Sequence, residues 1–246
     1  MIISHKYRFI FVKTAKTAGT SIEVLLSQIC EEEAVVTPFA FPEAAHRPRN
    51  FKGRFNPLPE VIYILRSGAV RVHLRETLED YRAGIRFRNH TPAWRIRCRV
   101  EPQIWRDYFK WCVVRNPFET VLSGWHYYRF KMHKDISLND YLVLLKKRKE
   151  RKLYGVGSFP LNWYNYTDLR SGQVLVDRIA KYENLEDELR LIFRELRIPF
   201  RGGLSIRAKG NIRRDKRSYR DVLTCEWRRL IEELFREELE QHGYSY

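Results

Sequence analysis

The sequence predicts an α/β fold in which helices flank a central, mostly parallel β-sheet. Three observations support it: strand-like and helix-like segments alternate along the chain, several helix starts carry capping residues, and 246 residues can bury one full core. We therefore expect a single domain over residues 1–246. The predicted strands are residues 7–12, 61–65, 110–114 and 177–182, and the predicted helices lie near residues 19–29, 117–131, 137–148, 185–196 and 225–241.

Apolar patterning supports the elements of the first half. Residues 7–12 form a strand-like run, and residues 22–29 form an amphipathic segment that suits a helix. The short apolar run at 61–65 is interpreted as a strand. Residues 111–114 are apolar throughout, which is typical of a strand buried on both faces of a parallel sheet.

Capping residues support the later helices. Asn116 is a good N-cap, Pro117 suits a first helical position, and Glu119 would lie in the first turn. The other expected helix starts are near Ser137, Asn184 and Thr224. In the last helix, apolar residues recur at spacings of three and four and predict one buried stripe: Trp227, Leu230, Ile231, Leu234, Phe235 and Leu239.

Charge and cysteine content narrow the classes of partner. A formal net charge of +16 favours an anionic ligand: a nucleotide with several phosphates, an acidic glycan or lipid, or nucleic acid. The basic run at 146–152 is interpreted as a solvated helix end. The four cysteines lie far apart without metal-ligand spacing, so we expect neither a metal site nor a disulfide framework.

The N-terminus enters a strand pattern almost at once. No charged-then-apolar leader precedes it, and no apolar run approaches the ~20 residues that cross a bilayer. We therefore expect no membrane span and a cytoplasmic location.

A loop rich in hydroxyl groups joins the first predicted strand to the first predicted helix. Backbone N–H groups at a helix start lack internal partners and carry partial positive charge, and Gly19 lets the backbone approach a ligand closely. Lys16 adds a full charge. Further donors come from Thr17, Thr20 and Ser21. The loop predicts a site for a phosphate-like anion.

A second candidate anion site follows the strand at 110–114. Arg115 would lie at the carboxyl end of that strand, which is the edge where open parallel sheets bind ligands. Ser123 comes about two turns into the next helix, so its hydroxyl could reach the same anion. The alternative is that Arg115 only neutralises a carboxylate.

These two motifs together resemble the sulfotransferases. The loop is not a Walker A sequence, because Lys16 precedes the loop's only glycine by three residues. It resembles instead the 5'-phosphosulfate loop of the branch with bacterial and Golgi carbohydrate sulfotransferases, including heparan 2-O-sulfotransferases, although that branch often has proline where Ala15 stands. Arg115-Asn116-Pro117 followed by Ser123 resembles the 3'-phosphate motif of the same family.

The resemblance implies a P-loop-like three-layer sandwich and a reaction. The donor would be 3'-phosphoadenosine 5'-phosphosulfate (PAPS), its product 3',5'-adenosine bisphosphate, and the acceptor a hydroxyl of a carbohydrate or glycan-like molecule. Lys16 would stabilise the leaving phosphate, and Arg115 with Ser123 would hold the 3'-phosphate. The 5'-phosphosulfate would be gripped by Thr17, Ala18, Gly19, Thr20 and Ser21. In a later basic loop, Arg207 and Lys209 are candidates for further 3'-phosphate contacts.

His90 is the candidate catalytic base. It stands in a segment that resembles the family's histidine-bearing stretch, and imidazole accepts a proton near neutral pH. His126 is the rival base. Lys13 could touch the sulfate or be an exposed loop lysine. Residues 35–88 resemble nothing in the family apart from the apolar run, which leaves the acceptor open.

Two other classes compete with this interpretation. An atypical P-loop nucleotide kinase should show a magnesium-binding aspartate at the end of an apolar strand, but the best candidate, Asp177, precedes its strand. A non-enzymatic RNA-binding protein would explain the charge and the 14% aromatic content, but not two anion motifs in register. We therefore expect no nucleic-acid partner.

Overall fold

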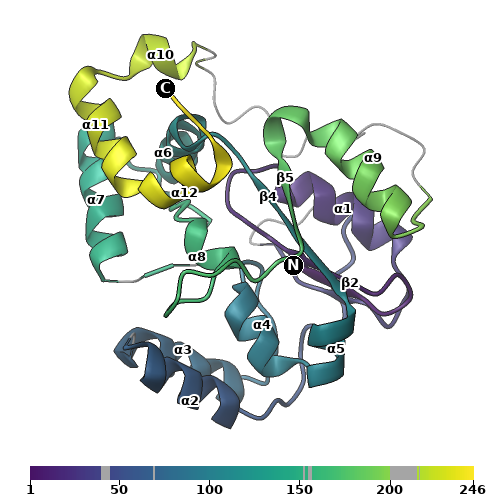
Figure 1. The fold of residues 1–246 in the computed structure, drawn as a ribbon. Helices are drawn as coiled ribbons and strands as arrows, with labels where there is room; N and C mark the ends of the chain where they lie inside the picture. The colour runs from purple at the N-terminus through teal and green to yellow at the C-terminus, as the bar shows by residue number, and fades with distance from the viewer. Residues whose placement is uncertain (40–44, 69, 152, 155–156, 200–214, 216) are drawn as a thin grey trace.

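A five-stranded mixed sheet, flanked by helices, organises the molecule (Figure 1). The computed structural model describes residues 1–39, 45–68, 70–151, 153–154, 157–199, 215 and 217–246. The strands are β1 (Ile2–Ser4), β2 (Phe9–Val12), β3 (Val35–Val36), β4 (Phe109–Val114) and β5 (Arg178–Lys181). The helices are α1 (Gly19–Ile29), α2 (Leu58–Ser67), α3 (Val70–Arg82), α4 (Ala93–Arg99), α5 (Pro102–Asp107), α6 (Pro117–Met132), α7 (Leu138–Glu150), α8 (Trp163–Tyr166), α9 (Leu185–Glu195), α10 (Tyr219–Val222), α11 (Cys225–Leu234) and α12 (Arg236–His242).

The strand order is β3-β1-β2-β4-β5. β2, β4 and β5 run parallel, whereas β1 is antiparallel to both of its neighbours. Val12 pairs with Cys112, so β2 and β4 end at nearly the same level of the sheet. The two predicted anion motifs therefore leave neighbouring parallel strands at the same edge.

Apolar side chains bury both faces of the sheet. Helices α1 and α9 cover one face through residues such as Ile22, Leu26 and Phe193. The other face is covered by α4, α5 and α8, with Ile96 and Tyr166 buried against it. A separate helical lobe packs α6, α7, α10 and α11 around its own apolar cluster (Figure 1). Among the described residues, every helix is too short or too polar to cross a bilayer.

Most predicted elements are confirmed, but the interpretation of residues 61–65 as a strand was wrong. These residues lie inside α2, which has proline in its first turn, a position that proline favours. A short apolar run fits a strand and a helix equally well by composition. The exposure along α2 is helical: Ile64 is fully buried, while Ile62 and Leu65 are exposed.

The single helix predicted over residues 225–241 is two helices. Phe235 leaves the helical backbone region with φ −118° and ψ 23°, and its buried side chain packs in the helical lobe. Thr224 caps α11 as expected, because its hydroxyl accepts from the N–H of Trp227. The apolar spacing continues across the break, so periodicity alone could not reveal it.

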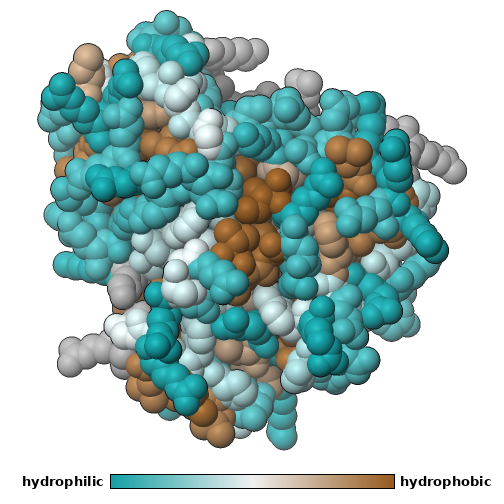
Figure 2. Space-filling view, in the orientation of Figure 1, coloured by the Kyte–Doolittle hydropathy of each residue, from teal (hydrophilic) through white to brown (hydrophobic). Residues whose placement is uncertain are grey.

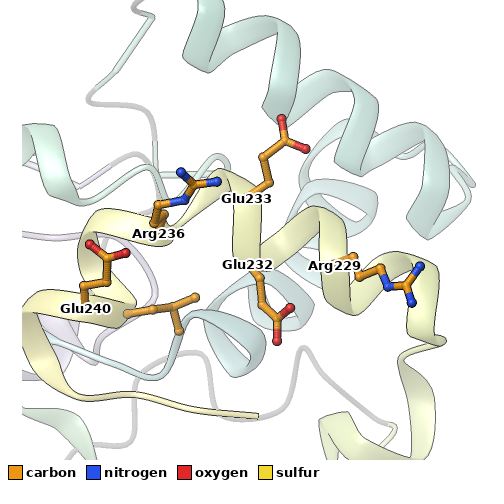
Figure 3. Close-up of a pocket in the computed structure, with 6 residues that line it drawn as sticks. Arg229, Glu232, Glu233, Arg236 and Glu240 are labelled. Atoms are coloured by element: carbon orange, nitrogen blue, oxygen red, sulfur yellow. The ribbon is translucent and has the colours of Figure 1, made fainter.

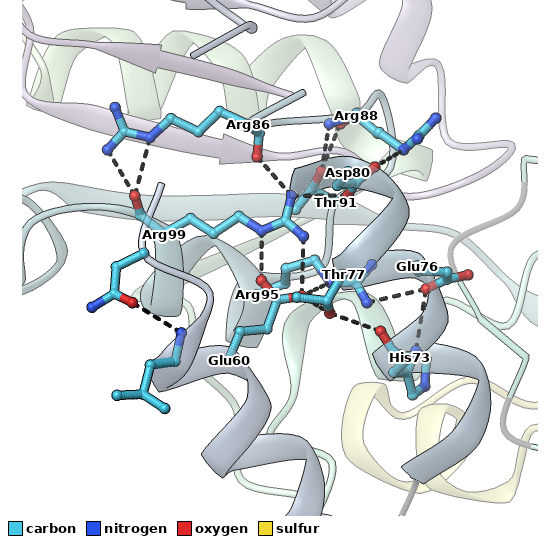
Figure 4. Close-up of polar contacts among 12 residues, drawn as sticks. Glu60, His73, Glu76, Thr77, Asp80, Arg86, Arg88, Thr91, Arg95 and Arg99 are labelled. Atoms are coloured by element: carbon cyan, nitrogen blue, oxygen red, sulfur yellow. Dashed lines mark hydrogen bonds and ion pairs between the residues drawn. The ribbon is translucent and has the colours of Figure 1, made fainter. Parts of the chain in front are cut away.

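A buried network of ion pairs fastens α2 and α3 to α4 (Figure 4). Arg99 Nε lies 2.6 Å from Glu60 Oε2, and Arg99 Nη1 lies 2.9 Å from Asp80 Oδ2. The three side chains are at most 2% exposed. Arg95 adds a second ion pair to Glu60 at 2.7 Å. Glu60 and Asp80 share Arg99 only while both helices stay docked on α4.

Replacing Arg99 by alanine should therefore strongly destabilise the protein. The substitution leaves Glu60 and Asp80 without their shared partner, and breaking a buried pair in this way costs about 3–5 kcal/mol. Urea unfolding measures the free energy of unfolding. The matched control is Arg106→Ala, whose ion pair with Asp107 is exposed and should contribute less than about 1 kcal/mol. Equal effects of the two variants would show that the buried network does not fasten the helices.

Candidate active site

The loop between β2 and α1 is compact and partly left-handed. Lys16 and Ala18 have φ values of 66° and 60°, a region that side-chain-bearing residues seldom adopt. Glycine is required at position 19, because the chain packs closely there: a Cβ atom would stand 2.8 Å from Lys13 Cγ and 3.3 Å from the Thr14 carbonyl oxygen. Helix α1 begins at this glycine, so Thr20 and Ser21 stand in its first turn. N–H groups of a first helical turn have no intrahelical acceptors and suit an anion.

Hydrogen bonds from three segments hold this loop. The Thr14 hydroxyl lies 2.7 Å from that of Thr17 and donates to the carbonyl of Val113 in β4. Asn162 bonds both polar groups of Ala15: its Oδ1 accepts from the N–H at 2.7 Å, and its Nδ2 donates to the carbonyl at 2.9 Å. The Thr17 side chain is fully buried in this arrangement. Its hydroxyl therefore supports the loop from within.

The two lysines of the loop have different surroundings. Lys16 is half-buried, and its ammonium lies 4.1 Å from the ring centroid of Tyr127 on α6. Lys13 is 3% exposed and forms an ion pair with buried Glu23. Burial lowers the pKa of Lys13, although Glu23 opposes the shift. The interpretation of Lys13 as an exposed loop lysine was therefore wrong.

Arg115 joins the second motif to the first. It follows β4, and Asn116 then caps α6 by accepting from the N–H of Phe118. The Arg115 guanidinium donates to the Lys16 carbonyl at 3.4 Å and to Glu119 at 3.2 Å. It also lies 4.3 Å from the ring centroid of Tyr182. Arg115 thus pairs with a carboxylate, as expected if it only neutralised one. Its guanidinium also contacts the anion loop.

Ser123 and His126 lie further along α6. Ser123 is half-buried, and its hydroxyl has no hydrogen-bond partner within the described part of the chain. Residues four apart share a helix face, so Ser123 lies on the side of α6 where Tyr127 meets Lys16. The His126 ring packs on Trp125, whose indole donates to the Ile136 carbonyl.

His90 reaches the same loop from the turn before α4. Its Nδ1 lies 3.3 Å from the Lys13 carbonyl oxygen, and its Nε2 faces Gly157, where a Cβ atom would come within 2.9 Å. The described residues thus bring together Lys16, the first turn of α1, His90 and Arg115. The remaining candidates, Arg207 and Lys209, lie outside the described residues.

Several site residues were missed by sequence reasoning. Asn162 and Asn165 bind the loop backbone, since Asn165 Nδ2 donates to the Lys13 carbonyl at 3.1 Å. Tyr127 and Tyr182 contact the two cationic side chains. The only sequence signal was the pair of asparagines three residues apart, the spacing of one helical turn.

Asp177 does not supply a metal ligand to this edge of the sheet. Its carboxylate accepts from the Lys110 N–H at 2.7 Å, at the amino end of the parallel strands. Arg115 and the anion loop lie at the carboxyl end. Among the described residues, no cluster of three histidine, cysteine or carboxylate side chains could hold a metal ion.

An open depression on α11 and α12 makes a second candidate site (Figure 3). Its lining residues are Arg229, Glu232, Glu233, Arg236, Leu239 and Glu240. Glu232 and Glu233 point away from each other in Figure 3, so the charges do not converge on one ligand. The loop between β2 and α1 therefore remains the stronger candidate site.

Comparison with known proteins shows the family of the chain. The model of the sulfotransferase family matches residues 1–245, so the chain belongs to the sulfotransferase family and is an enzyme of that class. An uncharacterised protein of Archaeoglobus fulgidus is 34% identical over 110 residues, which cover 44% of this chain and 83% of that protein. No solved structure matches the chain. The resemblance to sulfotransferases is confirmed, and the carbohydrate-acting branch stays a prediction.

Replacing Asn162 by alanine should loosen the anion loop. The change leaves the Ala15 N–H and carbonyl without partners at a buried position, which costs about 1–3 kcal/mol for each unsatisfied group. We expect faster hydrogen exchange at the Ala15 amide and a lower melting temperature. Asn165→Ala removes one bond to the loop and should have the smaller effect. Unchanged exchange at Ala15 in the Asn162 variant would contradict this role.

Proposed function

We propose that this sulfotransferase moves a sulfuryl group from PAPS to a hydroxyl of a carbohydrate or glycan-like acceptor. The observation that carries the proposal is the 3.4 Å hydrogen bond from Arg115 to the Lys16 carbonyl. It joins two anion-binding motifs whose residues lie 99 positions apart in the chain. A donor with charged groups on both the 5' and 3' positions of one ribose requires such a pair of neighbouring sites.

The loop and the first turn of α1 fit the 5' end of the donor. Gly19 lets the loop backbone pack closely against Lys13 and Thr14, and Thr20 and Ser21 stand in the first turn of the helix, where backbone N–H groups have no intrahelical acceptors. Bound PAPS supplies an activated sulfuryl group whose leaving group is a phosphate. Lys16 would lie where negative charge grows as the S–O bond breaks, and a charge placed there stabilises the transition state most.

Arg115 and Ser123 would hold the 3'-phosphate. Glu119 orients the guanidinium, and Tyr182 packs against its face. The Arg115 side chain is 18% exposed, so an anion can reach it and pair with a partly desolvated charge. Arg207 and Lys209 are proposed as further contacts to the same phosphate.

His90 is proposed as the base that takes the acceptor proton. When Nδ1 carries the ring proton and donates to the Lys13 carbonyl, Nε2 keeps its lone pair. A hydrogen bond from Nδ1–H to this carbonyl would favour the tautomer whose Nε2 accepts a proton. The acceptor oxygen then attacks sulfur, its proton passes to Nε2, and the nucleotide phosphate leaves.

The protein should bind 3',5'-adenosine bisphosphate more tightly than AMP, as isothermal calorimetry can measure. Arg115→Ala should remove about 1.5–3 kcal/mol of this preference, the usual range for a hydrogen bond to a charged group. Arg129→Ala is the matched control, because it removes a half-buried arginine from the last turn of the same helix. Equal affinities of the wild-type protein for the two nucleotides would refute the donor assignment.

Replacing His90 by alanine should lower the rate of sulfuryl transfer by roughly a hundredfold or more, the usual contribution of a general base. Affinity for the bisphosphate and the melting temperature should change little. His126→Ala serves as the control on the neighbouring helix. A near wild-type rate in the His90 variant, with a low rate in the His126 variant, would move the base to His126.

A further inference from the structure

Helix α2 turns three large apolar side chains outward. Leu58, Ile62 and Leu65 follow one another at spacings of four and three, which places them on one helix face. They are 58%, 39% and 56% exposed. The opposite, buried face carries the charged Glu60. Glu60 shares the buried face with Ile64, so α2 differs from an ordinary amphipathic surface helix in carrying a charge inside and an apolar row outside.

Helix α3 continues the apolar surface. Val72, Leu78 and Tyr81 are between 39% and 49% exposed. Figure 2 shows hydrophobic side chains gathered over α2 and α3, at the lower left of the view. Of the ten large apolar side chains that stand exposed in the described residues, six lie on these two helices. We call Leu58, Ile62, Leu65, Leu78 and Tyr81 the α2–α3 apolar face. Val72 is left out, because it lies about half a turn away from Tyr81 around α3.

The α2–α3 apolar face cannot turn into the protein core. Glu60 and Asp80 are held by Arg99 on α4, and the Thr77 hydroxyl donates to Glu60 at 2.7 Å. Rotating either helix to turn its exposed apolar residues toward the core would separate these buried ion pairs. Breaking a buried pair is strongly unfavourable, so the outward orientation is built into the fold.

Basic residues surround the α2–α3 apolar face. Arg66 and Arg82 are exposed on α2 and α3. Lys52 and Arg54 are also exposed, and the hydrogen bond from Gly53 N–H to the Gly84 carbonyl places their segment beside the end of α3. On α3 itself, Arg75 is neutralised by Glu79 at 2.7 Å. The rim is therefore positive, on a chain of net charge +16.

We propose that the α2–α3 apolar face docks on an anionic lipid surface. Exposed apolar residues within a basic rim bind a bilayer by burying apolar area at the headgroup boundary and by attracting anionic lipids. A second copy of the chain is a poorer occupant, because two positive rims would face each other across the contact. Neither feature depends on sulfuryl transfer, so this proposal stands or falls separately from the proposed function.

Sedimentation with vesicles tests the proposal. The wild-type protein should bind vesicles of phosphatidylcholine with roughly 30% phosphatidylserine, and bind phosphatidylcholine vesicles at least about tenfold less. The triple variant Leu58→Ser, Ile62→Ser, Leu65→Ser should lose about tenfold or more of the binding to anionic vesicles. Arg66→Glu combined with Arg82→Glu should lose a similar amount, and added salt should weaken wild-type binding.

Leu191→Ser is the matched control, because Leu191 is 45% exposed on α9, away from this face. It should bind anionic vesicles like the wild type. Circular dichroism melting and bisphosphate affinity establish that each variant is folded. Wild-type protein that stays in the supernatant, or a triple variant that binds like the wild type, overturns the proposal. A wild-type dimer in solution that the triple variant dissociates would overturn it too, in favour of a second copy as the occupant.

Discussion

Backbone pairing between β2 and β4 determines where the candidate active site of this protein lies. Because the strands are parallel and Val12 pairs with Cys112, the segments that follow them leave the sheet at one edge. The side chain of Arg115 can then reach the carbonyl of Lys16, although 99 positions separate the two residues. An antiparallel arrangement would send the two motifs to opposite ends of the sheet. The candidate active site is thus a direct consequence of strand direction and register.

The anion loop is held in a strained shape by side chains from elsewhere. Left-handed backbone at Lys16 and Ala18 costs roughly 1–2 kcal/mol per residue relative to ordinary conformations. Asn162 and Thr14 offset this cost through hydrogen bonds to Ala15 and Val113. The family often has proline where Ala15 stands, and proline has no N–H to donate. In this chain the Ala15 N–H binds Asn162 instead, so a tertiary hydrogen bond replaces the rigidity of a proline ring.

The α2–α3 hairpin packs on the rest of the fold through charged side chains as well as apolar ones. Elsewhere, apolar faces pack on the sheet or inside the helical lobe. Here two charged residues face inward, because Glu60 and Asp80 pair with Arg99 on α4, and several large apolar residues remain exposed. A helix of this kind is stabilised by polar complementarity more than by apolar burial. The exposed apolar residues of this hairpin can therefore contact a partner, whereas apolar residues packed into the core cannot.

The sequence by itself determined the local features of the site. Gly19, Lys16 and the Arg115-Asn116-Pro117 start of α6 were predicted from their chemistry, because caps, close approaches and charges act over a few residues. The sequence also predicted the α/β class and most element boundaries near the two motifs. The tertiary structure alone decided which distant groups meet: Asn162 with Ala15, His90 with the Lys13 carbonyl, and Glu60 with Arg99. It also decided that residues 61–65 form a helix. A short apolar run fits a strand and a helix equally well, and only the contacts with neighbouring elements determine which of its side chains are buried.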